Sequence, residues 1–453
     1  MSKTTDTPTV PFPGPAPLSA EQHPNTDRPP NRLVPSPGKA PLSAEQCPHL
    51  GREYNHFAGP HLQNPHPFFE RLRQEAPVTF NPMLGMWLIS RYDDITAVLN
   101  NASSFSSSSA VASKDKLTPE AQAILGPGPI IHDSPLNMDP PAHTRLKRLL
   151  QRGFTPAKIA RLEPRIRQFT NTLIDGFIQE GRVNLVERFA SPLPVQVILS
   201  MVGVPQEDME RVRGWSAALF GLIFAQIPPE AQPALARGVV EYRDYCTQLI
   251  EQRRRQPQED LTSDLIAAEP DGEALTMPEL LSLIGGSLLA AGHETTTAQL
   301  ALCVKSLLEQ PERWRRLRED RSLISKAAEE CMRLEGVAPG MTRTALQDVV
   351  VGGVLLPKGS RLLLLYGSAN HDAAHFQDPE RFDLEREGPQ HLTFGRGIHF
   401  CLGAQLARLE ARLGLEALVT RFSRLSPGEG PVRWNTSLVV RGPLTLPLVA
   451  HPA

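Results

Sequence analysis

One ten-residue segment near the C-terminal end, FGRGIHFCLG at positions 394–403, constrains this chain more than any other part of its sequence. The stretch that follows it has leucines at helical spacing, which predicts a helix. Gly395 and Gly397 allow backbone angles that other residues rarely adopt, so the loop can lie flat against a large ligand. Cys401 falls near the first turn of the predicted helix, where free N–H groups and the helix dipole favour a thiolate. The segment therefore predicts a thiolate ligand beside a flat loop.

Three interpretations of this cysteine compete. A free cysteine in a chain of this kind is most often a small buried apolar residue. His399 and Cys401 have the residue types of half a zinc site, but no second Cys/His pair stands nearby at zinc spacing. The third interpretation is a sulfur ligand to haem iron. The complete pattern FGxGxHxCxG favours it, because a chance match at six fixed positions is very improbable.

On these residues the segment resembles the haem-binding loop of the cytochrome P450 family, the haem-thiolate monooxygenases. The resemblance implies a fold that is mainly α with smaller β-sheets. In that fold haem b lies between a long central helix and the loop and helix that carry the cysteine. It makes Cys401 the axial iron ligand and places Phe394, Gly395, His399 and Gly403 beside the haem.

Composition supports one large domain behind a tail. The chain has 453 residues, 40% of them hydrophobic, and shows no boundary after about residue 60, so we expect a domain over 51–453. Residues 1–50 include twelve prolines, which exclude helix over most of that length, and we expect a disordered tail.

Charge, cysteine usage and apolar runs limit the partners and the compartment. A net charge of -2 argues against binding to nucleic acid. The five scattered cysteines indicate a reducing compartment. The longest apolar run is too short to span a bilayer, and the N-terminus lacks the apolar core of a signal peptide. We therefore expect a cytoplasmic monomer with no membrane attachment.

A single long, largely buried helix is predicted for the segment MPELLSLIGGSLLAAGHETTTAQLALCVKSLLEQ. The Thr295 hydroxyl is placed to bond the carbonyl of Ala291, four residues back, which would distort the helix. The resemblance implies that Glu294 and Thr295 are the acid–alcohol pair that delivers protons on the distal side of the haem. It also places Ala291 against the haem, and the small residues Ser287 and Ala290 leave space above the ring.

Basic residues on two further segments complete the predicted haem site. His143 and Lys147 lie four apart on the predicted helix HTRLKRLLQRGF and share a face. The resemblance implies that both hold a haem propionate, as does Arg343 on a later segment. The family usually has arginine where Lys147 stands, and lysine keeps the charge but loses the bidentate fork.

Two other groups of residues take roles from the resemblance. Glu330 and Arg333 are three apart on a predicted helix and can pair, and Arg381 is expected to close them into a buried triad that supports the Cys401 loop. Candidates for substrate contact are Leu219, Phe220, Ile223, Phe224, Ser287, Ala290, Val337, Leu438 and Val439. The apolar segment that holds the first four is equally well explained as core.

These parts predict a monooxygenase that inserts one atom of O2 into a hydrophobic small molecule, by hydroxylation or epoxidation. The sequence holds no flavin-binding pattern and no cysteine cluster for an iron–sulfur centre, so electrons are expected from a separate ferredoxin and ferredoxin reductase. A basic patch that would steer an acidic ferredoxin can form from Arg145, Arg148, Arg152, Arg396, Arg408 and Arg412. Arg408 and Arg412 are equally well explained as solvated surface residues.

Two alternatives remain open at this point. A peroxide-driven haem-thiolate peroxygenase would not need the acid–threonine pair. A non-catalytic haem sensor would need neither a proton relay nor a mobile cover over its pocket.

Overall fold

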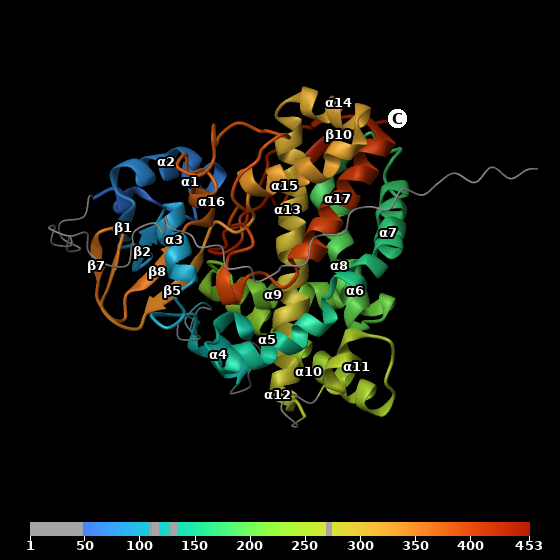
Figure 1. The fold of residues 1–453 in the computed structure, drawn as a ribbon. Coiled ribbons are helices and arrows are strands. Elements are labelled where there is room, and N and C mark those ends of the chain that lie inside the picture. Colours follow the sequence, from blue (N-terminus) through green and yellow to red (C-terminus); the bar gives the residue numbers. More distant parts are fainter. Residues whose placement is uncertain (1–48, 109, 111–116, 127–133, 269–273) are drawn as a thin grey trace, which may run out of the picture. The chain divides into compact units, whose positions relative to one another are not determined.

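The structure, a computed structural model, describes residues 49–108, 110, 117–126, 134–268 and 274–453 (Figure 1). The predicted tail, residues 1–50, lies almost wholly outside the described residues. All described residues belong to one compact unit, Arg32–Ala453.

Helices dominate this unit, as predicted. In chain order they are α1 (Pro60–Gln63), α2 (His66–Glu75), α3 (Tyr92–Leu99), α4 (Pro119–Leu125), α5 (Ala142–Gly153), α6 (Pro156–Arg161), α7 (Glu163–Asp175), α8 (Pro192–Val202), α9 (Met209–Phe224), α10 (Gln232–Arg255), α11 (Leu261–Ile266), α12 (Met277–Leu281), α13 (Ala291–Leu308), α14 (Pro311–Glu319), α15 (Ile324–Leu334), α16 (Tyr366–Ala369) and α17 (Ala404–Arg421). No helix in the described part of the chain combines the length and the apolar composition needed to cross a membrane.

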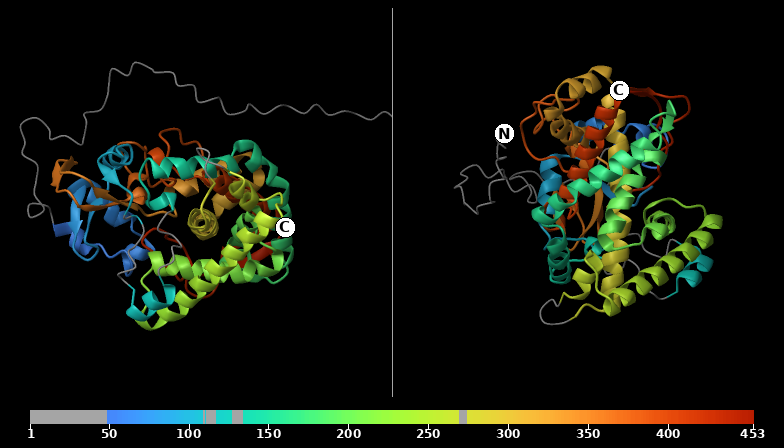
Figure 2. Two further views of the ribbon diagram at one scale, coloured as in Figure 1. Left: turned by 90° about the horizontal axis from the view of Figure 1, so that it is seen from below. Right: turned by 90° about the vertical axis from the view of Figure 1, so that its right-hand side faces the viewer.

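The predicted long helix is present as three consecutive pieces. α12 continues through a π-helical stretch, Ser282–Ala290, into α13, and the left view of Figure 2 looks along it. Its start is fixed by a capping box, in which the Thr276 side chain accepts from the Glu279 N–H and the Glu279 carboxylate accepts from the Thr276 N–H. Apolar residues cover most of its surface, so it is buried among other helices.

The first core cluster joins the central helix to the helix that follows the cysteine loop. Leu300 and Val304 of α13 pack with Leu193 of α8, Cys331 of α15 and Leu418 of α17, and all five are buried. Burying a leucine-sized side chain contributes about 1.5–3 kcal/mol. This cluster therefore holds α17, and with it the cysteine loop, in a fixed position relative to α13.

A second core cluster packs α9 and α10 against the π-helical stretch. It includes Leu219 of α9, Tyr242 of α10, Leu149 of α5 and Ile284 of the π-helical stretch. The Tyr242 hydroxyl donates to the carbonyl of Gly285 in the π-helical stretch at 2.9 Å. α9 is therefore held against the same helix that α17 contacts from another side.

The β-structure of the described residues consists of three small sheets. Its strands are β1 (Val78–Asn81), β2 (Met86–Ile89), β3 (Phe105–Ser106), β4 (Arg182–Asn184), β5 (Met341–Ala345), β6 (Val349–Val351), β7 (Val354–Leu356), β8 (Arg361–Leu364), β9 (Phe422–Pro427) and β10 (Pro447–Pro452). The five-stranded sheet has the order β1-β2-β8-β5-β3, in which only β2 and β8 run parallel. The others are β4-β10-β9 and β6-β7. The expected fold class, mainly α with smaller sheets, is confirmed.

The segment NTSLVVRGPLTLPLVA divides between two structures. Its first part is a hairpin, in which the Asn435 N–H donates to the carbonyl of Gly442 at 3.0 Å. The Leu438 N–H at its tip donates to the carbonyl of Phe224 at 2.9 Å, so the tip contacts the end of α9. The last part is β10, which pairs with β4 and β9 instead.

Candidate active site

The cysteine loop is a tight structure that depends on glycine. Gly395 and Gly397 have φ of 68° and 70°, in the left-handed region that favours glycine. A Cβ on Gly397 would lie 2.5 Å from the carbonyl oxygen of Leu99, so only glycine allows this approach to α3. The Cys401 N–H donates to the carbonyl of Phe394 at 2.9 Å and closes the loop. The sulfur is therefore presented immediately before α17, as predicted.

Cys401 differs from the other described cysteines. Cys246, Cys303 and Cys331 are buried among apolar side chains, whereas Cys401 lies deep in the fold but faces open space. Its position does not match a buried apolar residue. No group of three or more potential metal ligands occurs among the described residues, so the zinc interpretation gains no partner for Cys401.

Two influences act on the protonation of the Cys401 thiol. Burial is the larger and raises its pKa, while the Gly403 N–H and the charges of Lys147 and Arg408 lower it. In the protein alone burial therefore outweighs the predicted preference for a thiolate, and the pKa of the Cys401 thiol is raised. Binding of a metal ion would remove the proton, because metal ligation requires the thiolate.

The structure brings together the four predicted basic residues. The rings of His143 and His399 are 4.2 Å apart, and Arg343 on β5 and Lys147 on α5 lie close enough to influence both. Burial, Lys147 and Arg343 lower the pKa of His143 to about 4, and burial, Arg343 and His143 lower that of His399 to about 3. Both imidazoles are therefore neutral at pH 7.

This basic group fits a dianionic ligand such as haem b. The Arg343 side chain is buried, donates to the carbonyl of Thr342 at 2.7 Å and forms no ion pair among the described residues. His143 Nδ1 is buried and has no hydrogen-bond partner among the described residues. The buried Arg343 cation and the unpartnered His143 Nδ1 fit two propionate groups. The free thiol of Cys401 fits an iron that takes a sulfur ligand.

Lys147 makes contacts that the sequence did not predict. Its ammonium donates to the carbonyl of Ile398 and, at 2.9 Å, to that of Phe400. Both carbonyls belong to the loop that carries Cys401, so the lysine braces this loop from α5. A contact between Lys147 and a propionate stays a prediction.

One face of the central helix is open. Ser287 and Ala291 are four apart and Glu294 and Thr295 follow one turn later, and all four retain exposed surface on a helix that is otherwise mostly buried. The Thr295 hydroxyl donates to the carbonyl of Ala291 at 2.9 Å, which confirms the predicted bond. Burial raises the pKa of Glu294, and Arg213 opposes this shift.

Five of the nine predicted pocket residues meet in one apolar cluster. Phe220 and Phe224 of α9, Val337 after α15, and Leu438 and Val439 of the hairpin tip share it. The rings of Phe220 and Phe224 are 4.8 Å apart.

The other four pocket predictions have different outcomes. Leu219 and Ala290 are buried in the core between α9, α10 and the central helix. Leu219 lies one residue before Phe220, which faces the apolar cluster, and Ala290 lies one residue before Ala291, which is on the open face of the central helix. Ile223 packs against that same core. The Ser287 hydroxyl lies on the open face, 2.9 Å from that of Ser134.

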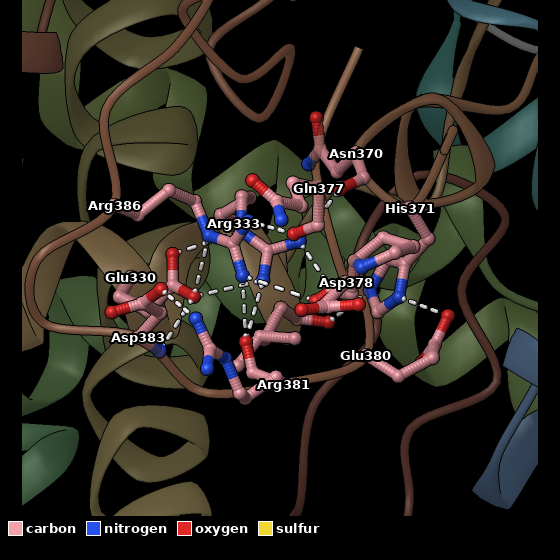
Figure 3. Close-up of polar contacts among 12 residues, drawn as sticks. Glu330, Arg333, Asn370, His371, Gln377, Asp378, Glu380, Arg381, Asp383 and Arg386 are labelled. Atoms are coloured by element: carbon pink, nitrogen blue, oxygen red, sulfur yellow. Dashed lines mark hydrogen bonds and ion pairs between the residues drawn. The ribbon is translucent and has the colours of Figure 1, made fainter. Parts of the chain in front are cut away.

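The predicted triad exists, but its third member was predicted wrongly (Figure 3). Glu330 and Arg333 are both nearly inaccessible and share two hydrogen bonds of 2.8 Å. The residue that closes the group is Arg386, whose Nε donates to Glu330 Oε1 at 3.0 Å. The Arg381 side chain is 63% exposed and pairs with Asp383 instead. Only the Arg381 carbonyl joins the network, accepting from Arg333 and Arg386.

This network connects to the cysteine loop through a residue that the sequence did not mark. The carbonyl of Asn370 accepts from Arg333 at 2.8 Å, and its side-chain amide donates to Thr393 Oγ1 at 2.9 Å. Asn370 Oδ1 accepts from the Leu392 N–H at 2.6 Å. Residues 392–393 lead directly into Phe394, so the ion pairs hold the start of the loop. An asparagine that follows a short helix, here α16, carries no sequence signal for this role.

The predicted basic patch is smaller than expected. Arg408 pairs with Glu329 at 2.6 Å, and Arg412 pairs with Glu163 at 2.8 Å. Arg145 pairs with Glu279 at 2.5 Å. These three charges are compensated locally, and the exposed arginines that remain from the prediction are Arg148, Arg152 and Arg396.

Comparison with known proteins agrees with this arrangement. Residues 55–447 match the family described as Cytochrome P450. Nocardicin C N-oxygenase of Nocardia uniformis subsp. tsuyamanensis is 40% identical over 402 residues, which cover 86% of this chain and 97% of that protein. Mycinamicin IV hydroxylase/epoxidase of Micromonospora griseorubida is 37% identical over 389 residues, covering 84% and 94%.

A solved structure shows the same fold. Cytochrome P450 CREJ in complex with (4-ethylphenyl) dihydrogen phosphate superposes with a TM-score of 0.83 at 32% identity, and the match covers 88% of this chain and 100% of that one. This chain thus shares its fold with that structure and extensive sequence identity with the relatives named above. On this fold it carries a thiol presented by a glycine-dependent loop, a buried basic group and an open helix face. The chain belongs to the cytochrome P450 family and is an oxidoreductase of the monooxygenase type.

Proposed function

We propose that this protein is a haem-thiolate monooxygenase that inserts one oxygen atom into a hydrophobic small molecule, by hydroxylation or epoxidation. The observation that carries the proposal is the position of Cys401. It is the exposed cysteine of the described chain, it precedes α17, and its loop carries His399, which lies close to the buried Arg343 that forms no ion pair among the described residues.

Residues of this chain would bind and orient haem b. Cys401 supplies the sulfur ligand, and Arg343, His143 and His399 hold the propionates, while Lys147 braces the cysteine loop. When bound, a haem with a thiolate ligand supplies the oxygen-activating chemistry. The basic residues make its retention favourable, because buried propionates would be costly without charged partners.

Glu294 and Thr295 would supply protons on the distal side. The hydrogen of the Thr295 hydroxyl is directed to the Ala291 carbonyl, which leaves the oxygen lone pairs free to hold a water molecule. Because burial raises the pKa of Glu294, this carboxyl retains its proton to a higher pH than an exposed glutamate. A protonated carboxyl next to a hydroxyl is a suitable proton donor.

The substrate is proposed to be an apolar molecule of moderate or large size. The cluster around Phe220, Phe224 and Leu438 offers apolar and aromatic surface. The names of two relatives describe oxygenation of nocardicin C and mycinamicin IV, which supports a substrate from secondary metabolism.

A separate ferredoxin and ferredoxin reductase are proposed as electron donors, with the protein acting as a cytoplasmic monomer. Arg148 and Arg152 on α5 and Arg396 on the cysteine loop are exposed, and Arg396 lies five residues from the proposed ligand. This smaller basic surface would still attract an acidic partner at low salt.

The central test is the carbon-monoxide difference spectrum of the reduced protein, with wild type beside Cys401→Ala. Wild type is expected to give the thiolate-type band and the variant to lose it. A variant that keeps the band would refute the assignment of Cys401.

Turnover assays test the reaction. Product formed with ferredoxin, reductase, NADPH and O2 supports the monooxygenase. Product formed only with hydrogen peroxide would support the peroxygenase alternative instead.

A further inference from the structure

A buried histidine next to the proposed proton donor has no role in the function proposed above. His293 precedes Glu294 on the central helix and is 2% exposed. Its Nε2 lies 2.7 Å from the hydroxyl oxygen of Ser216, which is a buried residue of α9. Burial and then Arg213 lower the pKa of His293 to about 4, so the ring is neutral at pH 7.

The hydrogen bonds of Ser216 define which nitrogen of this ring carries the proton. The Ser216 hydroxyl donates its hydrogen to the carbonyl of Arg213 at 3.0 Å. With its hydrogen engaged in that bond, the oxygen is left to accept from His293, and on this basis we assign the proton to Nε2 and the lone pair to Nδ1. The side chain of a neighbouring helix thus selects the tautomer.

The Nδ1 lone pair faces the proposed proton donor. Nδ1 lies 3.7 Å from Glu294 Oε1, which is beyond hydrogen-bond length but within electrostatic range. A lone pair at this position repels a carboxylate and attracts a protonated carboxyl. The tautomer selected by Ser216 therefore favours the protonated form of Glu294.

The charged groups around Glu294 do not cancel this preference. Arg213 of α9 favours the carboxylate, but its guanidinium is bound at the same time to Glu210 of α9. From α8 the central helix is approached by the apolar Ile198, since a Cβ on Gly292 would lie 2.8 Å from its Cγ1. The titratable and charged groups next to Glu294 are thus His293 and Arg213, and Glu210 acts on Glu294 indirectly by pairing with Arg213.

The position of Ser216 on α9 relates this hydrogen bond to the pocket. Ser216, Phe220 and Phe224 are spaced four residues apart and form one ridge of the helix. Phe220 and Phe224 belong to the apolar cluster at the hairpin tip. A bound molecule that pushes this ridge away from the central helix would lengthen the hydrogen bond between Ser216 and His293. A molecule that pulls the ridge toward the central helix would shorten this bond.

We propose that His293 is a positioning residue for Glu294, and that its hydrogen bond to Ser216 couples the position of α9 to proton delivery. With α9 in place, the ring holds the carboxyl in its protonated form. With α9 displaced, the ring loses its Nε2 partner and no longer selects one tautomer. The inference rests on the proposed function, in which Glu294 delivers protons.

The test compares Ser216→Ala with Ser216→Thr in the complete chain loaded with haem. Ser200→Ala is a matched control, because the Ser200 hydroxyl also donates to a carbonyl three residues back, at 2.8 Å, on α8. The nitrogen-15 spectrum of labelled histidine in the reduced carbon-monoxide form reports the tautomer, with the His293 signal identified by its loss in His293→Gln. The infrared band of protonated carboxyl groups reports Glu294, identified in the same way by Glu294→Gln.

Wild type, Ser216→Thr and Ser200→Ala are expected to show the Nε2-protonated ring and the Glu294 carboxyl band. Ser216→Ala is expected to show a mixture of tautomers and a several-fold weaker band. The fraction of NADPH electrons recovered as product should fall several-fold in Ser216→Ala alone, with substrate affinity retained.

An unchanged tautomer and carboxyl band in Ser216→Ala would overturn the inference. Failure of the proposed function is a separate result, namely full electron recovery in Glu294→Gln. A variant that does not fold is detected by loss of the thiolate-type band, in which case Ser216→Cys takes the place of the alanine variant.

Discussion

Arg386 Nε donates to Glu330 Oε1 at 3.0 Å, and the two side chains are only 10% and 5% exposed. Glu330 also binds Arg333 and accepts from the Asp383 N–H at 3.0 Å. The carboxylate thus has every partner that a buried anion requires. Through Arg333 and Asn370 this network reaches the first residues of the cysteine loop.

Removing Arg386 is expected to be far more damaging than removing Arg381. Arg386→Met leaves Glu330 with one guanidinium instead of two and deprives three backbone carbonyls of a donor. Breaking a buried pair typically costs about 3–5 kcal/mol. Arg381→Met removes one exposed ion pair and should change the free energy of unfolding by no more than about 0.5 kcal/mol. Urea unfolding of both variants measures the difference, and equal losses would contradict the assignment of Arg386.

Lys147 is expected to matter for the cysteine loop more than for overall stability. Lys147→Met removes the donor to the carbonyls of Ile398 and Phe400. The loop should then hold Cys401 less firmly, with lower haem retention and a partial loss of the thiolate-type carbon-monoxide band. Lys158→Met, at an exposed ion pair with Asp264, is the control and should leave both unchanged. If Lys147→Met binds haem as wild type does, the bracing role is wrong.

Sequence reasoning succeeded where the chemistry depends on short spacings. The bond from Thr295 to the Ala291 carbonyl and the pair Glu330 with Arg333 follow from helix geometry, which relates residues three or four apart. The position of Cys401 follows from a pattern within ten residues. In each case a single element determines the contact.

It failed where distant segments or irregular backbone decide the contact. Arg381 and Arg386 lie in one loop without periodicity, and the path of that loop, including Asp378 at φ 45°, determines which arginine turns inward. The partners of Arg408 and Arg412, Glu329 and Glu163, come from other helices. Such pairings have no local pattern, so the basic patch was predicted too large.

Thr295 and Thr296 provide a matched pair for the proton-delivery proposal. Both hydroxyls donate to the carbonyl four residues back, but Thr295 lies on the open face and Thr296 is buried. Thr295→Ala should divert electrons from product to peroxide or water, because general-acid assistance typically contributes about 10²–10⁴-fold in rate. Thr296→Ala should keep the wild-type ratio of product to NADPH consumed. Equal ratios in both variants would show that the Thr295 hydroxyl is not needed.

Stability is expected to fall with pH below the ordinary pKa of histidine, and His56 and His293 are part of the cause. Burial lowers the pKa of each to about 4, from an ordinary value of 6.5. Between pH 6.5 and 4 the unfolded chain therefore binds more protons than the folded chain, and the free energy of unfolding decreases as pH decreases.

Each such histidine contributes a slope of at most about 1.4 kcal/mol per pH unit. His56→Gln is expected to reduce the slope measured by urea unfolding between pH 6.5 and 4.5. His451→Gln, at an exposed residue of β10, is the control and should leave the slope as in wild type. The two histidines are separable because His56 bonds the Ser437 carbonyl at 2.8 Å, whereas His293 bonds Ser216. A slope unaffected by His56→Gln would mean that this imidazole is charged in the folded protein despite its burial.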